Sequence, residues 1–516
     1  MTALGPALEP QGIEPFGNDR RPPRFWTIPD RALSAIYTLA LVVSISTWFI
    51  AFRAPLRLDE TGSYWQISAG FSEIWARRYL LFPAYPYILW FSTKIIGTSE
   101  IALRVPSIIA MFGAVYLLYL GARELFERDI AFIAAIVFCL DPIVLFTSID
   151  VRPYAFGVLA TNAAILVLLR LRRRSSVWLA ALFGISSALI VWFHILLGVV
   201  LPALMLSFIV LTFRDRKIFW KQLGVVLAAF AVTFLPVIPG LIDMFRTSKT
   251  HTYEPAPTVA ELLQTLIPGR PFAIVCCIGF VAFLVYAART KRASSSRFEI
   301  GHLMLCVSLA LIPALIQFGV SRGTSAHTFT YYHRLSAVPG IALCWAFGIG
   351  CFRSRNLRLL ICVALAVSTA FLCLTAPFSR LHQYSLKYAI ELIEKNASVD
   401  DAPVVMCSGF AESNFVAMPS MEAVKNSRYF APLSYYQLSV PVIPLPQILN
   451  NPAIQIGSQF LQTAARKHER FLVTGDAVYS AGTLAWFTEN AAATHIVHNL
   501  GVFDGMEVLE FVPREH

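Results

Sequence analysis

Two adjacent acidic residues stand out in a chain that is otherwise mostly apolar. Asp59 and Glu60 follow the hydrophobic segment 31–52 after only a few residues. A charged side chain placed against a bilayer costs free energy, so such residues mark candidate sites of function. A carboxylate here could take the proton of a substrate hydroxyl as that hydroxyl reacts. The alternative is a solvated pair of loop acids without a chemical role.

A second polar group follows another apolar segment. Asp150, Arg152 and Tyr154 come directly after the segment 130–149, and Pro153 between them ends or kinks the helical path. A guanidinium in this place could bind a phosphate group through two hydrogen bonds. The alternative is a salt bridge between Asp150 and Arg152 that only secures a helix end.

Further candidates lie next to predicted membrane spans. Arg77 and Arg78 belong to a stretch with the pattern of an amphipathic surface helix, where they could attract a phosphate. His194 lies at a turn between two spans, and we weigh an interfacial histidine against a substrate contact. His333 and Arg334 enter a later span, where an aromatic belt with a snorkelling arginine is the competing interpretation.

Composition identifies the elements that must position these residues. The 516 residues are 57% hydrophobic and 14% charged, with a mean hydropathy of +0.62, which is more apolar material than one soluble core can bury. The sequence therefore predicts an α-helical polytopic membrane protein with about eleven transmembrane helices. The predicted spans are 32–52, 102–122, 130–149, 153–169, 176–194, 195–213, 218–239, 271–289, 301–320, 333–352 and 357–377.

Positive charge predicts how these spans are oriented. The segment 83–97 is short for a span and contains Pro86 and Lys94. If it stays at the membrane surface, the arginine-rich loops all fall on one side, which is the cytoplasm by the positive-inside rule. The net charge of +11 is explained in this way, so no nucleic-acid partner is predicted. The cysteines form neither a disulfide framework nor a metal-ligand pattern.

This topology divides the chain into three parts. Residues 1–30 are predicted to be a cytoplasmic tail, and 31–377 a transmembrane domain with a periplasmic loop at 53–101. Residues 378–516 are more polar and contain short β-like runs at 403–406, 470–474 and 506–512. They are predicted to form a periplasmic α/β domain. The protein is thus expected in the inner membrane, with the acidic pair on its outer face.

The order of several motifs resembles the bacterial membrane glycosyltransferases of the GT-C class. The similarity is to the family 39/83 type, which includes protein O-mannosyltransferases and aminoarabinose transferases. It covers about residues 30 to 350 and is carried by the following motifs: Leu-Asp-Glu-Thr-Gly-Ser-Tyr-Trp (58–65), Phe-Pro-Ala-Tyr-Pro-Tyr (82–87), Ser-Glu-Ile-Ala-Leu-Arg-Val-Pro-Ser (99–107), Ser-Ile-Asp-Val-Arg-Pro-Tyr (148–154) and Trp-Phe-His (192–194). Many relatives have His-Pro-Pro or Lys-Pro where this chain has Phe82-Pro83-Ala84.

The resemblance implies a sugar donor linked to polyprenyl monophosphate and an envelope acceptor, which could be a glycolipid, lipopolysaccharide, polysaccharide or protein. Asp59 would be the base of an inverting transfer, with Glu60 orienting it or the acceptor. Arg152, the pair His333 and Arg334, and Arg77 with Arg78 would stabilise the departing phosphate. A donor of this kind contains no nucleotide diphosphate, so no metal is required to hold one and no cofactor is expected, although a divalent ion between Asp59 and Asp150 is the alternative.

Two other classes share the predicted membrane topology. A glycan ligase or polymerase would use a lipid-linked oligosaccharide at the same membrane face. A lipid or solute transporter would also have about a dozen spans, but transporters tend to place ionisable groups at mid-membrane on broken helices. A lipid-linked monosaccharide bound in the outer cavity would distinguish the transferase from the ligase.

Overall fold

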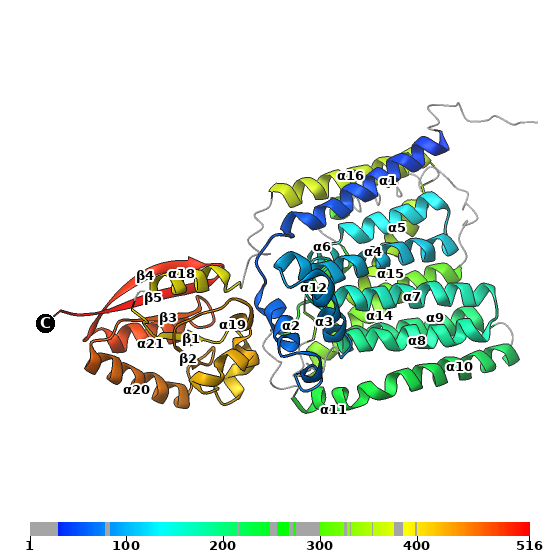
Figure 1. The fold of residues 1–516 in the computed structure, drawn as a ribbon. Coiled ribbons are helices and arrows are strands. Elements are labelled where there is room, and N and C mark those ends of the chain that lie inside the picture. The colour runs from blue at the N-terminus through cyan, green and yellow to red at the C-terminus, as the bar shows by residue number, and fades with distance from the viewer. Residues whose placement is uncertain are drawn as a thin grey trace, which may run out of the picture.

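The described residues form a helical bundle and a smaller domain (Figure 1). The computed structural model describes residues 29–77, 83–213, 216–247, 255–267, 272–274, 300–324, 328–330, 332–352, 354–375, 385–397 and 400–515. Long helices lie roughly side by side in the bundle, and the smaller domain adjoins one of its ends. This end also carries the helix that contains Asp59 and Glu60, so we refer to it as the site end.

The bundle helices follow the predicted apolar segments closely. Seven helices within the described ranges are long and apolar enough to cross a membrane, which confirms the polytopic helical architecture. The number of eleven spans is not confirmed, and the predicted span 271–289 lies almost wholly outside the described residues. The bundle helices are α1 Asp30–Ser46, α4 Glu100–Leu125, α5 Arg128–Leu140, α6 Pro142–Thr147, α7 Tyr154–Arg173, α8 Val177–Phe193, α9 Leu201–Thr212, α10 Arg216–Phe234, α11 Ile238–Thr247, α14 Ile300–Gly323, α15 Val338–Gly350 and α16 Arg355–Thr375.

The predicted span 130–149 is interrupted in the structure. It is divided into α5 and α6 at Asp141, whose carboxylate accepts a hydrogen bond of 2.8 Å from the Ile143 backbone N–H. Pro142 cannot donate to the preceding turn, so a new helix begins there. The break lets the chain turn toward Asp150 at the site end.

The connection between α1 and α4 contains short helices at the site end. Helix α2, Leu58–Ser68, is followed by α3, Tyr85–Ile96, which covers the segment predicted to stay at the membrane surface. Twelve residues span about 18 Å, well below the hydrocarbon thickness of about 30 Å, so α3 is too short to cross. It packs through Tyr85 and Leu89 in a buried apolar cluster with residues of α2 and α4. The short α12, Val259–Leu266, lies near this end as well (Figure 1).

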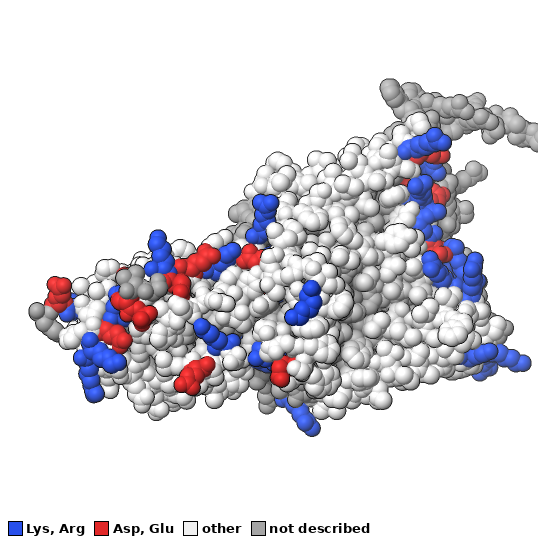
Figure 2. All heavy atoms as spheres, viewed as in Figure 1, with Lys and Arg blue, Asp and Glu red and all other residues white. Residues whose placement is uncertain are grey.

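Basic residues gather at the opposite end of the bundle. Figure 2 shows Lys and Arg concentrated at the end away from the smaller domain, and few charges on the band between the two ends. These basic residues flank the helices α4, α5, α7, α10 and α16, and include Arg123, Arg128, Arg170, Arg172, Arg173, Arg216, Lys217 and Arg355. The apolar band with charges at both ends is the surface expected of a membrane-spanning bundle.

The smaller domain contains a mixed five-stranded sheet in the order β2-β1-β3-β5-β4. The strands β1, β2 and β3 are parallel to one another, and β5 is antiparallel to both β3 and β4. Separate apolar cores cover its two faces, so the predicted small α/β domain is confirmed. Its elements are α18 Lys387–Ala397, β1 Val404–Cys407, α19 Pro432–Tyr435, β2 Val442–Leu445, α20 Asn451–Lys467, β3 Phe471–Asp476, α21 Ala481–Ala491, β4 His495–Phe503 and β5 Met506–Pro513.

Candidate active site

The first turn of α2 carries both acids of the predicted site. Arg57 is the N-cap residue, and its backbone N–H donates to Glu60 Oε2 at 2.8 Å, which closes a capping box. Consecutive residues of a helix point about 100° apart, so Asp59 and Glu60 face different surroundings. Their environments differ accordingly: Glu60 is buried, whereas Asp59 is only partly covered.

Glu60 lies in a fully buried network of charges. Its side chain is 1% exposed, and Arg104 Nη2 of α4 lies 3.2 Å from its Oε2. Its other carboxylate oxygen accepts a hydrogen bond of 2.9 Å from the Val151 backbone N–H. Burial opposes ionisation, but the positive charges of Arg104 and Arg57 outweigh it and lower the pKa of Glu60 below its ordinary value. Glu60 therefore remains an ionised anchor for α2.

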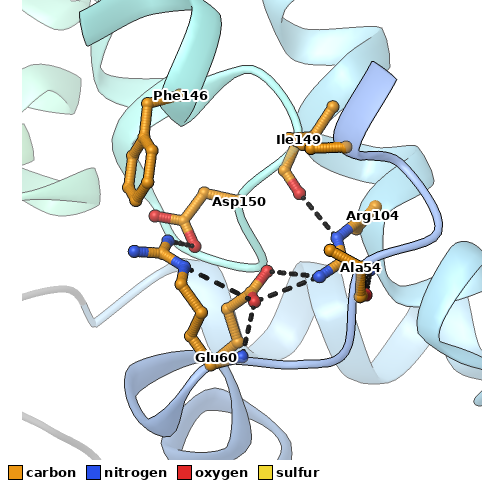
Figure 3. A pocket seen from close by; sticks show the side chains of 8 residues that line it. Ala54, Glu60, Arg104, Phe146, Ile149 and Asp150 are labelled. Atoms are coloured by element: carbon orange, nitrogen blue, oxygen red, sulfur yellow. Dashed lines mark hydrogen bonds and ion pairs between the residues drawn. The ribbon is translucent and has the colours of Figure 1, made fainter. Parts of the chain in front are cut away.

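Arg104 joins three chain segments through one guanidinium (Figure 3). Besides its pairing with Glu60, it donates to the carbonyl oxygens of Ala54 at 2.7 Å, Pro55 at 3.2 Å and Ile149 at 3.1 Å. The planar fork of arginine can make several such bonds at fixed angles, which lysine cannot copy. Arg104 thus fixes the approach to α2 and the turn at 149–151 relative to α4.

A second ion pair lies beside the first. Arg57 Nη2 lies 2.7 Å from Asp150 Oδ1, and Arg57 Nη1 donates to the Tyr332 hydroxyl at 2.8 Å. The Arg57 guanidinium also lies over the Phe146 ring, 4.0 Å from its centroid. Burial raises the pKa of Asp150 to about 6, although Arg57 opposes the shift. The two ion pairs line a small cavity at the site end, shown in Figure 3.

Asp59 differs from the other two acids in its contacts. Its backbone carbonyl accepts a hydrogen bond of 3.3 Å from Arg152 Nη1. Burial disfavours the charged form of Arg152, but Asp59, Tyr154 and Asp150 together outweigh this effect and raise the pKa of Arg152. Within the described part of the chain, the Asp59 carboxylate itself accepts no hydrogen bond. It is therefore an ionisable group next to a cation that is not committed to a structural bond.

Aromatic and imidazole rings extend this site across the ends of three helices. The Tyr154 ring stacks on Tyr332 with 5.5 Å between centroids and on His194 with 5.0 Å. His194 in turn lies 5.3 Å from His333. The structure thus brings together Tyr154, His194 and His333, three of the candidate site residues from the sequence. The Arg152 guanidinium lies 5.9 Å from the centroid of the Tyr154 ring, so these rings adjoin Arg152.

Three predicted residues are placed elsewhere or cannot be placed. Arg334 lies over the Phe329 ring at 4.9 Å, in line with an aromatic setting rather than a contact with Asp59. Arg77 stacks on Trp65 at 4.9 Å and donates to the Trp65 carbonyl, so it attaches to the last turns of α2. Arg78 lies outside the described residues.

Sequence reasoning missed three residues that build the site. Arg57 lies two positions before Asp59, and Arg104 falls in the segment 99–107 that was singled out only for its family resemblance. Tyr332 directly precedes His333, in the segment for which an aromatic belt is the competing interpretation. A signal existed for Arg104, since an arginine inside an apolar helix needs a buried anionic partner. Nothing in the spacing identifies Glu60 as that partner.

Comparison with known proteins agrees with this architecture. Residues 82–242 match the family model described as dolichyl-phosphate-mannose-protein mannosyltransferase. No curated protein sequence matches the chain.

Solved structures share the fold at low sequence identity. The crystal structure of ArnT from Cupriavidus metallidurans in the apo state has a TM-score of 0.56 and 12% identity, covering 93% of this chain and 98% of that one. The structure of the same protein bound to undecaprenyl phosphate has a TM-score of 0.54 and 11% identity, covering 92% and 98%. Residues 82–242 are thus similar to this mannosyltransferase family, and the chain shares the fold of ArnT, which is the GT-C fold of membrane glycosyltransferases.

Proposed function

We propose that this protein transfers a sugar from a polyprenyl-monophosphate-linked donor to an envelope acceptor. The proposal is supported by two similarities. The matched family model is described as dolichyl-phosphate-mannose-protein mannosyltransferase. A protein of the same fold, ArnT, has been crystallised with undecaprenyl phosphate bound. In both cases the lipid carries a single phosphate, so the reacting bond lies at the membrane boundary.

The contacts of Asp59 are the observation that carries the proposal. An acceptor hydroxyl is a weak nucleophile, so a carboxylate must take its proton as the new C–O bond forms. Glu60 is ion-paired with Arg104, and Asp150 is ion-paired with Arg57. Asp59 is the carboxylate of the three that lacks such a bond within the described ranges and is partly exposed. We assign Asp59 as the base and Glu60 as the residue that positions it.

Arg152 is assigned to the departing phosphate. Negative charge grows on the phosphate as the glycosidic bond breaks, and a preorganised guanidinium lowers the barrier. Arg152 is anchored to the Asp59 carbonyl through one nitrogen, which leaves the base and the cation adjacent. The rings of Tyr154, His194 and His333 would enclose the sugar and phosphate. Direct attack by the acceptor from the Asp59 side would invert the anomeric centre.

We further propose that the site faces the periplasm. The basic residues at the end opposite to the site fit the cytoplasmic side of an inner-membrane protein. The smaller domain and α2 then lie outside, where the acceptor glycans are built. Each bundle helix that begins or ends in an arginine cluster would be oriented by that charge.

A gene deletion tests the proposal without knowledge of the sugar. Cells lacking the gene should accumulate a polyprenyl-monophosphate sugar and lose one sugar from an envelope glycan, both measured by mass spectrometry of extracted lipids. Reintroducing the wild-type gene should reverse both changes. Accumulation of a lipid-linked oligosaccharide would indicate a ligase instead. An unchanged glycan with an untransported solute would indicate a transporter.

A further inference from the structure

The hydroxyl group of Tyr436 connects the smaller domain to the loop in front of Asp59. Tyr436, which follows α19, accepts a hydrogen bond of 2.8 Å from the Leu56 backbone N–H. The same hydroxyl donates to Glu100 Oε1 at 2.8 Å. Glu100 begins α4 of the bundle. Tyr436 therefore bridges the bundle and the loop from a domain more than 300 residues away in sequence.

The opposite side of this loop is held by α4 itself. The Arg104 guanidinium donates hydrogen bonds to the carbonyl oxygens of Ala54 and Pro55. Arg104 and Glu100 lie four residues apart on one face of α4. The carbonyls of the loop are thus fixed by Arg104 directly, while the next N–H is fixed through Tyr436 and Glu100. Removing the Tyr436 hydroxyl leaves Leu56 N–H without this acceptor, three residues before Asp59.

Neighbouring contacts make the Tyr436 hydroxyl well positioned. Lys387 Nζ of α18 lies 3.2 Å from Glu100, which holds the carboxylate toward the smaller domain. Tyr435 donates to the Thr98 carbonyl at 3.0 Å and packs against the ring of Tyr64 at 4.9 Å. A Cβ atom added at Gly409 would lie only 2.9 Å from Leu58, so the domain approaches α2 closely. The smaller domain therefore contacts both the start of α4 and the helix α2.

We propose that Tyr436 is a positioning residue, through which the smaller domain sets the place of Asp59 for proton transfer. This inference rests on the proposed function of Asp59. A loop released at Leu56 would let the first turn of α2 shift, and small displacements of a base slow proton transfer while leaving substrate binding intact. The effect on turnover should be about tenfold, the rate equivalent of one hydrogen bond.

The test compares Tyr436→Phe with Tyr435→Phe in the full-length protein. Both variants keep the ring. Tyr435→Phe removes the hydrogen bond to the Thr98 carbonyl, whereas Tyr436→Phe removes the bonds to Glu100 and to Leu56, so only Tyr436→Phe releases Leu56. Hydrogen–deuterium exchange of peptides covering 52–62 reports the Leu56 amide directly. Binding of undecaprenyl phosphate, thermal stability and formation of the missing glycan in membranes of the deletion strain complete the comparison.

Tyr436→Phe should speed exchange at Leu56 and lower product formation about tenfold, with undecaprenyl phosphate affinity within about twofold of wild type. Tyr435→Phe should leave exchange at Leu56 and product formation close to wild type. Unchanged exchange at Leu56, or equal loss of product in both variants, would overturn the inference. If Asp59→Asn itself keeps wild-type product formation, the proposed function fails instead, and the exchange measurement still decides whether Tyr436 holds Leu56.

Discussion

Replacing Arg104 with methionine should destabilise the protein strongly, because it leaves the Glu60 charge buried without its partner. The Arg104 side chain is 2% exposed and that of Glu60 1%. Removing one partner of such a pair costs about 3–5 kcal/mol of unfolding free energy. The matched control is Arg173→Met: Arg173 pairs with Glu124 at 2.7 Å but is 60% exposed, so its loss should cost only about 0–1 kcal/mol.

A double variant separates charge from the other bonds of Arg104. Glu60→Gln in the Arg104→Met background removes the unpaired charge and should recover part of the stability. Recovery should be incomplete, since the carbonyls of Ala54, Pro55 and Ile149 remain without their donor. Thermal unfolding midpoints of the detergent-purified proteins measure the stabilities of wild type, Arg104→Met and the double variant. The reasoning is refuted if Arg104→Met is as stable as Arg173→Met, or if the double variant is no more stable than Arg104→Met.

The remaining predictions concern pH, phosphate and orientation. Burial opposes ionisation of Glu60, but Arg104 and Arg57 lower its pKa. The ionised carboxylate therefore stabilises the folded protein at neutral pH, and this stabilisation is lost in acid. The difference in thermal unfolding midpoint between wild type and Glu60→Gln should shrink between about pH 5 and pH 3. Arg152→Lys should retain undecaprenyl phosphate binding but lose turnover, whereas Arg152→Ala should lose both, and equal activity of Arg152→Lys and wild type would contradict the role. In a background lacking the native cysteines, a thiol at Ala69 should react with a membrane-impermeant reagent in intact spheroplasts and one at Arg173 should not; the reverse result would invert the topology.

Much of the bundle could be predicted from the sequence because its signal is local. Runs of apolar residues of membrane length specify helices, and clustered arginines specify an end of the bundle. The short α3 was anticipated in this way, since its length and Pro86 argue against a span. The division of the predicted span at Asp141 was not anticipated. A single acid within an apolar run does not by itself indicate a break, and the hydrogen bond from the Ile143 N–H to Asp141 is seen only in the structure.

The composition of the site was less predictable because it depends on distant partners. Asp59 and Glu60 are adjacent and chemically alike, so the sequence cannot tell base from anchor. They are distinguished by Arg104, an ion-pair partner 44 residues further on, and by the Val151 N–H. The contact of Tyr436 with Leu56 spans 380 residues and two domains. No spacing rule links residues at that separation, so such contacts emerge only from the folded chain.

The assignment of Asp59 as the base is tested most directly by Asp59→Asn. Asparagine keeps the size of the side chain and most of its hydrogen bonding but cannot take a proton at neutral pH. Membranes of the deletion strain carrying this variant should form the glycan about 10² or more times slower than wild type, with undecaprenyl phosphate binding and thermal stability retained. Wild-type product formation by Asp59→Asn would contradict the account.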